Sequence, residues 1–373
     1  MTLQGHLLTP SGFVRGELRV ANGRISEMPG VAVDESVVRS SPLPVVLPGF
    51  IDLHVHGGQG RDAMEGGDAV AAIARAHAQH GTTSLLATTM TAPLAEIKAA
   101  LRGLASVVAE RPQGAARVLG VHLEGPYINP GKLGAQPDFA CTATLADVLA
   151  LHAIAPLKLI TIAPEVAGHL ALIVHLRAQG FGVQIGHSNG TYEDGVAALA
   201  AGASGFTHLF NAMSGLHHRA PGMVGAALAH AECAEIIPDL LHVHPGAIRA
   251  ALRAIPGLYC VTDSTSAAGM PDGEYKLGRH AVTKCLGAVR LADGTLAGST
   301  LTMDQALRNL VSLGLPLREA SARTSTFAAD HLGLAERGRL ALGAWADAVV
   351  LDRDLQLLDV YVEGERIELK NAG

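Results

Sequence analysis

Aromatic side chains are scarce in this chain of 373 residues, since Phe, Trp and Tyr together make up 3%. Hydrophobic residues nevertheless reach 49% and charged residues only 17%, so aliphatic side chains and alanine must fill a sizeable core. That balance excludes a disordered chain. The net charge is −6 and no run of five basic residues occurs, so we expect no nucleic-acid partner.

Cysteines and long apolar runs are also few. No C-x-x-C pair occurs among the four cysteines, which are Cys141, Cys233, Cys260 and Cys285. This spacing argues against a disulfide framework or a thiolate zinc site and favours a cytoplasmic location. The first residues lack the basic and apolar regions of a signal peptide, and no apolar stretch reaches 18 residues. We therefore expect no membrane partner.

Both ends of the chain have strand-like patterns. Near the N-terminus, Asn22-Gly23 separates two alternating runs, which is a strong hairpin signal. From Ala348 onward, the segments AVVLD and LLDVYVEGERIEL alternate in the same way. Each end is too short to fold alone. We predict that residues 1–47 and 338–373 join in one small β-sandwich domain.

The middle of the chain alternates strand-like apolar runs with alanine-rich amphipathic stretches such as 68–80, 93–110 and 168–179. The candidate strands are 48–56, 82–90, 117–125, 157–164, 181–188, 205–213, 234–242 and 257–263. Eight strand-then-helix units predict an α/β fold, a (β/α)8 TIM-like barrel over residues 48–337. The seventh candidate strand is the least regular because it contains Pro238.

Polar, metal-capable side chains occur near the C-terminal ends of six of these strands, although buried parallel strands are normally apolar. They are Asp52, His54, His56, His122, Glu124, His187, His208, His242 and Asp263. In a barrel these ends meet at one face, where active sites lie. His54 and His56 point to the same side of their strand because side chains alternate. Imidazole and carboxylate ligands without thiolate favour a divalent ion such as zinc or iron.

A single histidine on a strand is more often a hydrogen-bonded core residue than a ligand, so the metal hypothesis depends on the shared location of the whole set. Six further histidines lie in helical stretches and are interpreted as structural or inert. They are His77, His80, His152, His169, His175 and His230.

Several segments resemble the amidohydrolase superfamily of metal-dependent barrel hydrolases. The general ones are PGFIDLHVHG at 48–57 and GRLALGAWADAVV at 338–350. More specific ones are HLEGPY at 122–127, GHS at 186–188, THLFNAM at 207–213, VTD at 261–263 and LAGS at 296–299. In this order they are similar to the N-acetylglucosamine-6-phosphate deacetylases of that superfamily. The likeness spans about residues 45 to 350.

The resemblance implies a role for each matching residue. Glu124, His187 and His208 would hold one divalent metal, and His54 and His56 would help to hold a second one, bridged through Glu124. Asp263 would be the general base and then the general acid in hydrolysis of an amino-sugar phosphate acetamide. The implied substrate-binding residues are Ala135, Gln136, Asn211, Ala212, Arg219, His242, Leu296, Ala297 and Gly298. The loop with Arg219 would reach a neighbouring subunit, so we expect a homodimer.

Two positions depart from the family pattern. Members usually have histidine, facing the substrate, where this chain has Gln136. They also have Asp-Gly-x-His where this chain has Asp239-Leu240-Leu241-His242. The first departure leaves the choice between gluco and galacto sugars open, and the second is expected to alter the loop before His242.

Alternative functions are also compatible with parts of the sequence. Residues 186–190, GHSNG, match the G-x-S-x-G elbow of a serine hydrolase with Ser188 as nucleophile. That alternative gives no role to His54, Glu124, His208 and Asp263. Another N-acyl substrate of an amidohydrolase is a second alternative. Relatives that bridge two metals through a carboxylated lysine are disfavoured, because none of the six lysines ends a candidate strand. A non-catalytic sugar-phosphate binder is the third.

Overall fold

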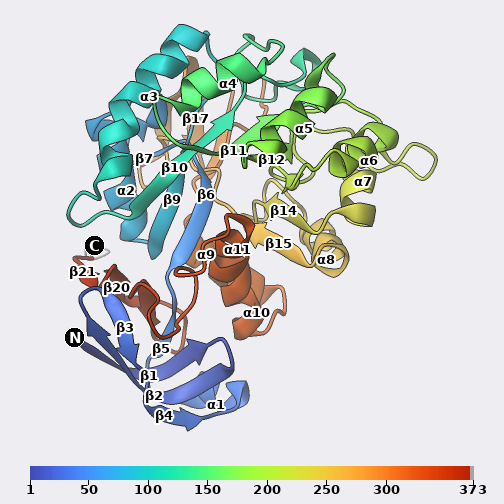
Figure 1. The fold of residues 1–373 in the computed structure, drawn as a ribbon. Coiled ribbons are helices and arrows are strands. Elements are labelled where there is room, and N and C mark those ends of the chain that lie inside the picture. Colours follow the sequence, from blue (N-terminus) through green and yellow to red (C-terminus); the bar gives the residue numbers. More distant parts are fainter. Residues whose placement is uncertain (370–373) are drawn as a thin grey trace.

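The strands from both ends of the chain join in one mixed sheet at the bottom of the molecule in Figure 1. The computed structural model describes residues 1–369. The order of strands is β21-β20-β19-β5-β1-β2-β3, and β4 also pairs with β2. The strands are β1 (Thr2–Thr9), β2 (Gly12–Ala21), β3 (Arg24–Glu27), β4 (Gly30–Ala32), β5 (Val45–Pro48), β19 (Ala348–Leu351), β20 (Leu357–Val362) and β21 (Glu365–Ile367).

The hairpin predicted at Asn22-Gly23 is confirmed. Both residues have positive φ, +51° and +75°, as a two-residue turn between β2 and β3 requires. The limits of the predicted small domain, 1–47 and 338–373, stay a prediction, and residues 370–373 of it lie outside the described part of the chain.

The eight predicted barrel strands are all present, although each is shorter than predicted. They are β6 (Phe50–Val55), β9 (Thr82–Thr88), β10 (Arg117–Glu124), β11 (Leu157–Ile162), β12 (Gly182–Ile185), β13 (Gly205–Phe206), β14 (Cys233–Ile236) and β15 (Gly257–Cys260). The first six form one parallel sheet and the last two form a pair. Backbone bonds of 2.9 Å close the ring, from Leu209 N to Glu235 O and from Asp263 N to His54 O. The fold is a TIM-like barrel.

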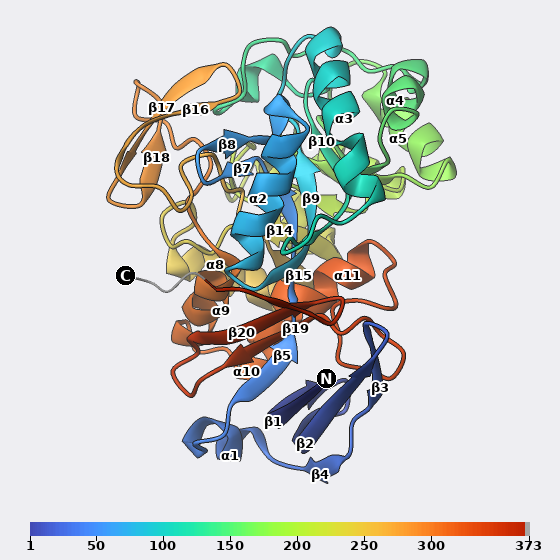
Figure 2. The same ribbon diagram turned by 90° about the vertical axis from the view of Figure 1, so that its left-hand side faces the viewer.

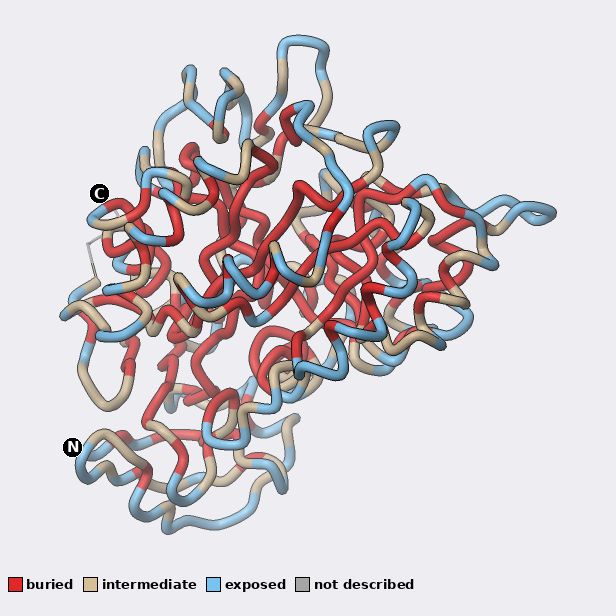
Figure 3. The backbone as a smooth tube through the Cα atoms, turned by 45° about the horizontal axis from the view of Figure 1, so that its top comes forward, coloured by how far each residue is buried: buried red, intermediate tan, exposed pale blue. Residues whose placement is uncertain are grey.

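Helices surround the strands (Figure 1). Those after the barrel strands are α2 (Asp68–Ala78), α3 (Leu94–Ala109), α4 (Leu145–His152), α5 (His169–Ala178), α6 (Tyr192–Ala200), α7 (Gly222–His230), α8 (Pro245–Ala254), α9 (Met303–Ser312), α10 (Leu317–Ser321) and α11 (Phe327–His331), while α1 (Glu35–Ser40) belongs to the terminal region. Buried residues recur every three or four positions in α3, as in any helix with one face on a core. Figure 3 shows the buried backbone gathered in the middle and exposed loops outside. None of the helices in residues 1–369 is long and apolar enough to span a membrane.

One predicted strand needs a correction. The segment 234–242 is a strand only as far as Ile236, because Pro238 lacks the N–H that a ladder requires. His242 therefore lies in the loop before α8 rather than at a strand end.

A small antiparallel sheet that the sequence reasoning did not predict projects beside the barrel mouth, drawn in orange in Figure 2. Its strands are β16 (Gly273–Leu277), β17 (His280–Cys285) and β18 (Ala288–Arg290), and a short pair, β7 (Gly57–Gly58) and β8 (Arg61–Asp62), lies nearby. The turn between β16 and β17 is tied down by Gly278 N, which donates to Asp62 Oδ2 at 2.7 Å. This projecting sheet brings Leu277 to the edge of the barrel mouth.

Candidate active site

Three of the predicted ligands meet at the C-terminal end of the barrel strands. Glu124 ends β10, His187 follows β12 and His208 follows β13. The Nε2 atoms of the two histidines lie 3.1 Å apart, and Glu124 Oε1 lies 3.1 Å from that of His187 and 3.0 Å from that of His208. All three residues are buried. One small ion would fit between these atoms.

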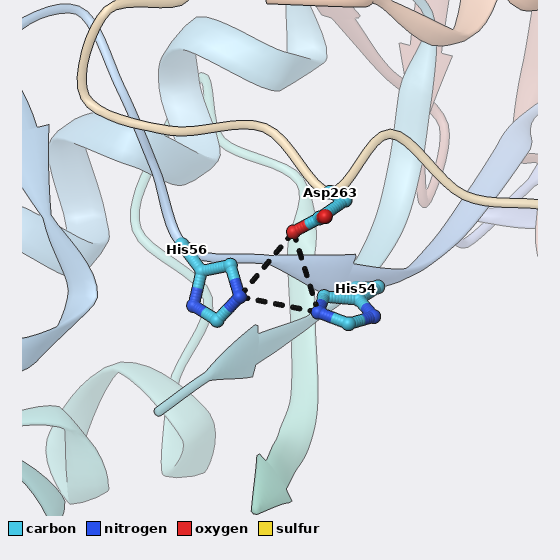
Figure 4. A group of neighbouring side chains, drawn as sticks. All are labelled: His54, His56 and Asp263. Atoms are coloured by element: carbon cyan, nitrogen blue, oxygen red, sulfur yellow. Dashed lines mark hydrogen bonds and ion pairs between the residues drawn. The ribbon is translucent and has the colours of Figure 1, made fainter. Parts of the chain in front are cut away.

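A second group lies beside the first and consists of His54, His56 and Asp263 (Figure 4). The two imidazole Nε2 atoms are 3.1 Å apart, and Asp263 Oδ1 lies 3.4 and 3.3 Å from them. The other carboxylate oxygen of Glu124, Oε2, lies 3.1 Å from His56 Nε2. Glu124 therefore turns one oxygen to each group, as a carboxylate shared by two ions would.

The protonation of the imidazoles fits a metal centre. His187 Nδ1 donates to the backbone carbonyl of Lys132 at 2.9 Å, and His54 Nδ1 donates to the carboxylate of Glu235 at 3.0 Å. A carbonyl can only accept, so Nδ1 of His187 carries a proton and Nε2 is the nitrogen that faces the centre. That nitrogen is available as a metal ligand. Imidazole and carboxylate ligands held from behind in this way are typical of zinc and iron sites.

The charges at the site also favour a bound cation. Burial would raise the pKa of Glu124, but the imidazoles of His54 and His187 outweigh it and hold the pKa well below its usual range. Burial would lower the pKa of His56, yet the carboxylates of Asp263 and Glu124 raise it to about 9. The carboxylates are therefore ionised, and the site attracts positive charge.

The backbone turns sharply where the strands end. His187, His208 and Asp263 have φ of +48°, +29° and +50°, which is the left-handed region that residues other than glycine rarely adopt. Such strain persists where the surrounding structure enforces it and is common at functional sites. Gly125, just after Glu124, also has positive φ, and a Cβ there would lie 1.9 Å from Thr91 Oγ1. Only glycine fits at this position.

Glu235 is a site residue that the sequence reasoning missed. It lies on β14, fully buried, and accepts from His54 Nδ1 at 3.0 Å and from His208 N at 3.1 Å. Tyr259 OH also donates to its carboxylate. One signal was available, because an acid inside the apolar run CAEII is almost never fully buried without partners. Through these bonds Glu235 links His208 of the first group with His54 of the second group.

Two polar residues that the strand pattern had marked as metal-capable do not join the two groups. Asp52 instead accepts from Thr262 Oγ1 at 2.6 Å, which ties β6 to the segment after β15, and burial raises its pKa to about 7. His122 pairs with Thr161 Oγ1 at 2.8 Å, although its ring also lies close to His54 and Glu235. Burial lowers the pKa of His122 to about 3, so it is a neutral core histidine.

A cavity of ≈ 200 Å³ opens over the two groups. Seven of the nine predicted substrate-binding residues line it, namely Ala135, Gln136, Asn211, Ala212, His242, Leu296 and Gly298. The other two lie outside. Ala297 is fully buried in a small hydrophobic cluster. Arg219 lies on an exposed loop away from the cavity lining, where its guanidinium is 2.9 Å from His218 Nε2.

The two positions that depart from the family pattern have distinct surroundings. The amide nitrogen of Gln136 donates to Glu124 Oε2 at 2.6 Å, and its oxygen accepts from Thr91 N at 2.7 Å. Gln136 thus holds a carboxylate of the site as well as lining the cavity. Leu240, at the position of the usual glycine, has φ of +66° and is therefore strained.

His242 is held by the same loop. Its Nδ1 lies 2.7 Å from Asp239 Oδ2. Burial would lower the pKa of His242, but the hydrogen bond and charge of Asp239 raise it. An imidazole with a raised pKa at the cavity wall favours an anionic group of a ligand.

The geometry does not support the serine-hydrolase alternative. Ser188 is fully buried, and its hydroxyl donates to Glu165 at 2.7 Å. Within residues 1–369 no histidine nitrogen is hydrogen bonded to this hydroxyl, and neighbouring His187 faces Glu124 instead. A nucleophilic serine needs both exposure and a base.

Comparisons with known proteins identify the family of this chain. The amidohydrolase family model matches residues 45–367. N-acetylgalactosamine-6-phosphate deacetylase of Escherichia coli O157:H7 is 40% identical over 368 residues, which cover 96% of this chain and 97% of that protein. N-acetylglucosamine-6-phosphate deacetylase of Vibrio furnissii is 40% identical over 331 residues, 86% of this chain and 82% of that protein. This chain belongs to the amidohydrolase family.

Solved structures of deacetylases are also similar to this chain. N-acetylglucosamine-6-phosphate deacetylase from Thermotoga maritima superimposes with a TM-score of 0.91 at 32% identity, covering 99% of this chain and 100% of that one. A variant of the Mycobacterium smegmatis enzyme, in complex with N-acetyl-D-glucosamine-6-phosphate, gives a TM-score of 0.90 at 33% identity and covers 99% of both chains. The barrel with its terminal sheet is thus shared over nearly the whole length.

Proposed function

We propose that this chain is a metal-dependent deacetylase that hydrolyses the acetamide of N-acetylglucosamine 6-phosphate to acetate and glucosamine 6-phosphate. The observation that carries the proposal is the pair of ligand groups around Glu124 at the base of a cavity. The names of the relatives support the substrate class. The hydrolase barrel would comprise residues 48–337, with the terminal segments 1–47 and 338–373 as its small domain.

Glu124, His187 and His208 would hold one divalent ion, and His54 and His56 would hold a second one that shares Glu124. Zinc and iron suit these ligands best. A bound ion of this kind lowers the pKa of water from 15.7 towards ~7 and polarises a carbonyl group. The residues of the chain fix the ligand geometry and keep the carboxylates ionised.

Asp263 would move the proton during hydrolysis. Burial would raise its pKa, but the imidazoles of His54 and His56 lower it, so the carboxylate is ionised and able to accept. Asp263 also lines the cavity. It would take a proton from water and deliver it to the amide nitrogen as the C–N bond breaks, which makes the amine a good leaving group.

The phosphate of the substrate would lie near Asn211, Ala212 and His242, where the imidazole of His242 supplies positive charge. Arg219 is exposed on its loop and would reach the cavity of a second subunit in a homodimer. A sedimentation-velocity run gives the mass of the particle. We expect about twice the chain mass, and a monomer at micromolar concentration would contradict the dimer.

The proposal is tested by acetate release from a panel of substrates with metal-loaded protein. The panel contains the 6-phosphates of N-acetylglucosamine, N-acetylgalactosamine and N-acetylmannosamine, together with unphosphorylated N-acetylglucosamine and an N-acetyl amino acid. We expect turnover of a phosphorylated hexosamine and little of the last two. Efficient hydrolysis of the amino acid alone would favour the alternative of another N-acyl substrate.

The galacto sugar is a second candidate substrate. The Escherichia coli relative named for N-acetylgalactosamine 6-phosphate matches this chain over 97% of its length, and Gln136 stands where the family usually has histidine. The kcat/KM ratio of the two sugars decides between them. A cytoplasmic location is also proposed, and it is supported by the four unpaired cysteines.

A further inference from the structure

Met90 lies between two cavities. It lines the catalytic cavity of ≈ 200 Å³ and also a second cavity of ≈ 560 Å³, which lies between the projecting sheet and the barrel. Of the described residues that line either cavity, Met90 alone lines both. Only 2% of it is exposed. A single side chain therefore contributes to both linings.

Met90 has close neighbours on two sides. Its backbone N–H donates to the sulfur of Met64 at 3.3 Å, and Met64 also lines the second cavity. On the other side, the turn of the projecting sheet lies so close that a Cβ on Gly278 would be 3.3 Å from Met90 Cβ and Cγ. Leu277 and Ala135 pack against the same cluster. Met90 is therefore a buried apolar residue in the wall between the two cavities.

Met90 lies opposite the polar end of the catalytic cavity. It follows β9, whereas Asn211 and Ala212 follow β13, and these two strands are four apart in a ring of eight. A substrate with its phosphate near Asn211 and His242 has its amide over the two ligand groups. In that placement, the acyl group on the far side of the amide would face the end of the cavity lined by Met90 and Leu277.

We propose that Met90 closes the acyl end of the catalytic cavity and limits the substrate to a short N-acyl group. The inference rests on the proposed function, because it assigns a direction to the substrate in that site. The second cavity lies directly behind this wall and has no part in acetyl binding. Truncation of Met90 joins the two cavities and makes room for a longer acyl chain.

The test compares N-acetyl, N-propionyl and N-butyryl glucosamine 6-phosphate by release of free amine. The variants are Met90→Ala, Met90→Val and Met90→Leu, with metal content and thermal midpoint measured for each. A methylene in a tight pocket changes kcat/KM by about 10-fold or more. Butyryl is two methylenes longer than acetyl, so we expect the wild type to favour acetyl over butyryl by about 100-fold or more. We expect Met90→Ala to raise the butyryl-to-acetyl ratio of kcat/KM by at least about 10-fold. Met90→Leu, of similar volume, keeps the wild-type ratio.

Met90→Val is expected to lie between the other two, and it carries the test if Met90→Ala does not fold. The inference is overturned if Met90→Ala or Met90→Val hydrolyses the acetyl substrate but keeps the wild-type ratio. It is also overturned if the wild type hydrolyses the butyryl substrate as fast as the acetyl one. Failure of the wild type on all three substrates, with metal bound, would overturn the proposed function instead.

Discussion

Asp263 faces both imidazoles of its group from the segment after β15, with Oδ1 within 3.4 Å of each Nε2. Replacement by asparagine keeps the size and one oxygen but removes the ability to accept a proton. We expect Asp263→Asn to lower kcat/KM by about 10³-fold or more while leaving metal content largely intact. Steady-state kinetics and metal analysis of the same sample check this. Normal turnover would remove the role given to Asp263.

Glu235 acts on the site through the histidines. Loss of a carboxylate behind a ligating imidazole typically costs 10- to 100-fold in metal affinity. We expect Glu235→Gln to weaken zinc binding by about this factor, measured by calorimetric titration of metal-free protein. Asp52→Asn is the matched control, because Asp52 is also buried on a barrel strand but accepts from Thr262 and from the backbone N–H of His54, not from an imidazole. Equal zinc affinities in Glu235→Gln and wild type would limit Glu235 to a structural role.

Some residues of the site could be predicted from the sequence and others could not. Glu124, His187 and His208 were predictable because each stands in a distinctive motif at a strand end. Glu235 has no such motif, and its role depends on β14 lying beside His54 only after the ring closes. The contact of Gln136 with Glu124 was equally hidden, because it forms across a loop.

Among the elements, the loop between β14 and α8 contains the clearest conflict between residue and backbone. Leu240 has φ of +66°, which costs an L-residue about 1–2 kcal/mol and costs glycine little. We compare Leu240→Gly with Leu240→Ala, since both remove the leucine side chain beyond Cβ. At an ordinary position glycine is the less stable of the two by roughly 0.5–1 kcal/mol. At position 240 we expect Leu240→Gly to have the higher free energy of unfolding, by about 1 kcal/mol, as measured by urea unfolding.

A result with Leu240→Ala the more stable variant would show that the loop adopts another conformation in solution. The kinetics of both variants give a further check. His242 lies two residues after Leu240 and is held by Asp239. A substitution of Leu240 is therefore expected to change mainly the KM for the phosphorylated substrate.

The presence of strands and helices was predicted better than the residues at which they begin and end. The eight strands and the helices over 68–80, 93–110 and 168–179 follow from apolar periodicity, which burial enforces. The strand ends were placed too late because polar residues such as His187 follow the last paired residue without a break in pattern. The projecting sheet β16–β18 was missed because its exposed strands bury few side chains and so carry little hydrophobic signal.

At the scale of the whole molecule, a group of ion pairs joins the terminal sheet to the bottom of the barrel. Glu363, in the turn between β20 and β21, pairs with Arg117 at 2.8 Å and with Arg111 at 3.2 Å. Arg337 is a third partner. Burial would raise the pKa of Glu363, but the hydrogen bonds and charges of Arg117 and Arg337 outweigh it and lower the pKa to about 2.

The pH dependence of stability follows from this pKa. Because the folded pKa of Glu363 lies below the ordinary 4.5, the ion pairs stabilise the fold above about pH 4.5 and lose this effect as pH falls towards 2. We expect Glu363→Gln to lower the unfolding free energy by about 1–2 kcal/mol at pH 7, after allowance for solvent screening. The difference in unfolding free energy between wild type and Glu363→Gln becomes smaller below pH 4.5. Asp354→Asn, at an exposed position, is the control. A difference that stays constant from pH 7 to 2.5 would contradict the role of the ion pairs.

The central claim is that divalent metal held around Glu124 makes this barrel an amide hydrolase. The most direct measurement is acetate release from N-acetylglucosamine 6-phosphate by protein stripped with a chelator and then given zinc or iron, beside Glu124→Gln treated in the same way. We expect activity to disappear on stripping, to return with metal in the wild type, and to stay absent in the variant. Full activity in metal-free protein, or restored activity in Glu124→Gln, would contradict the claim.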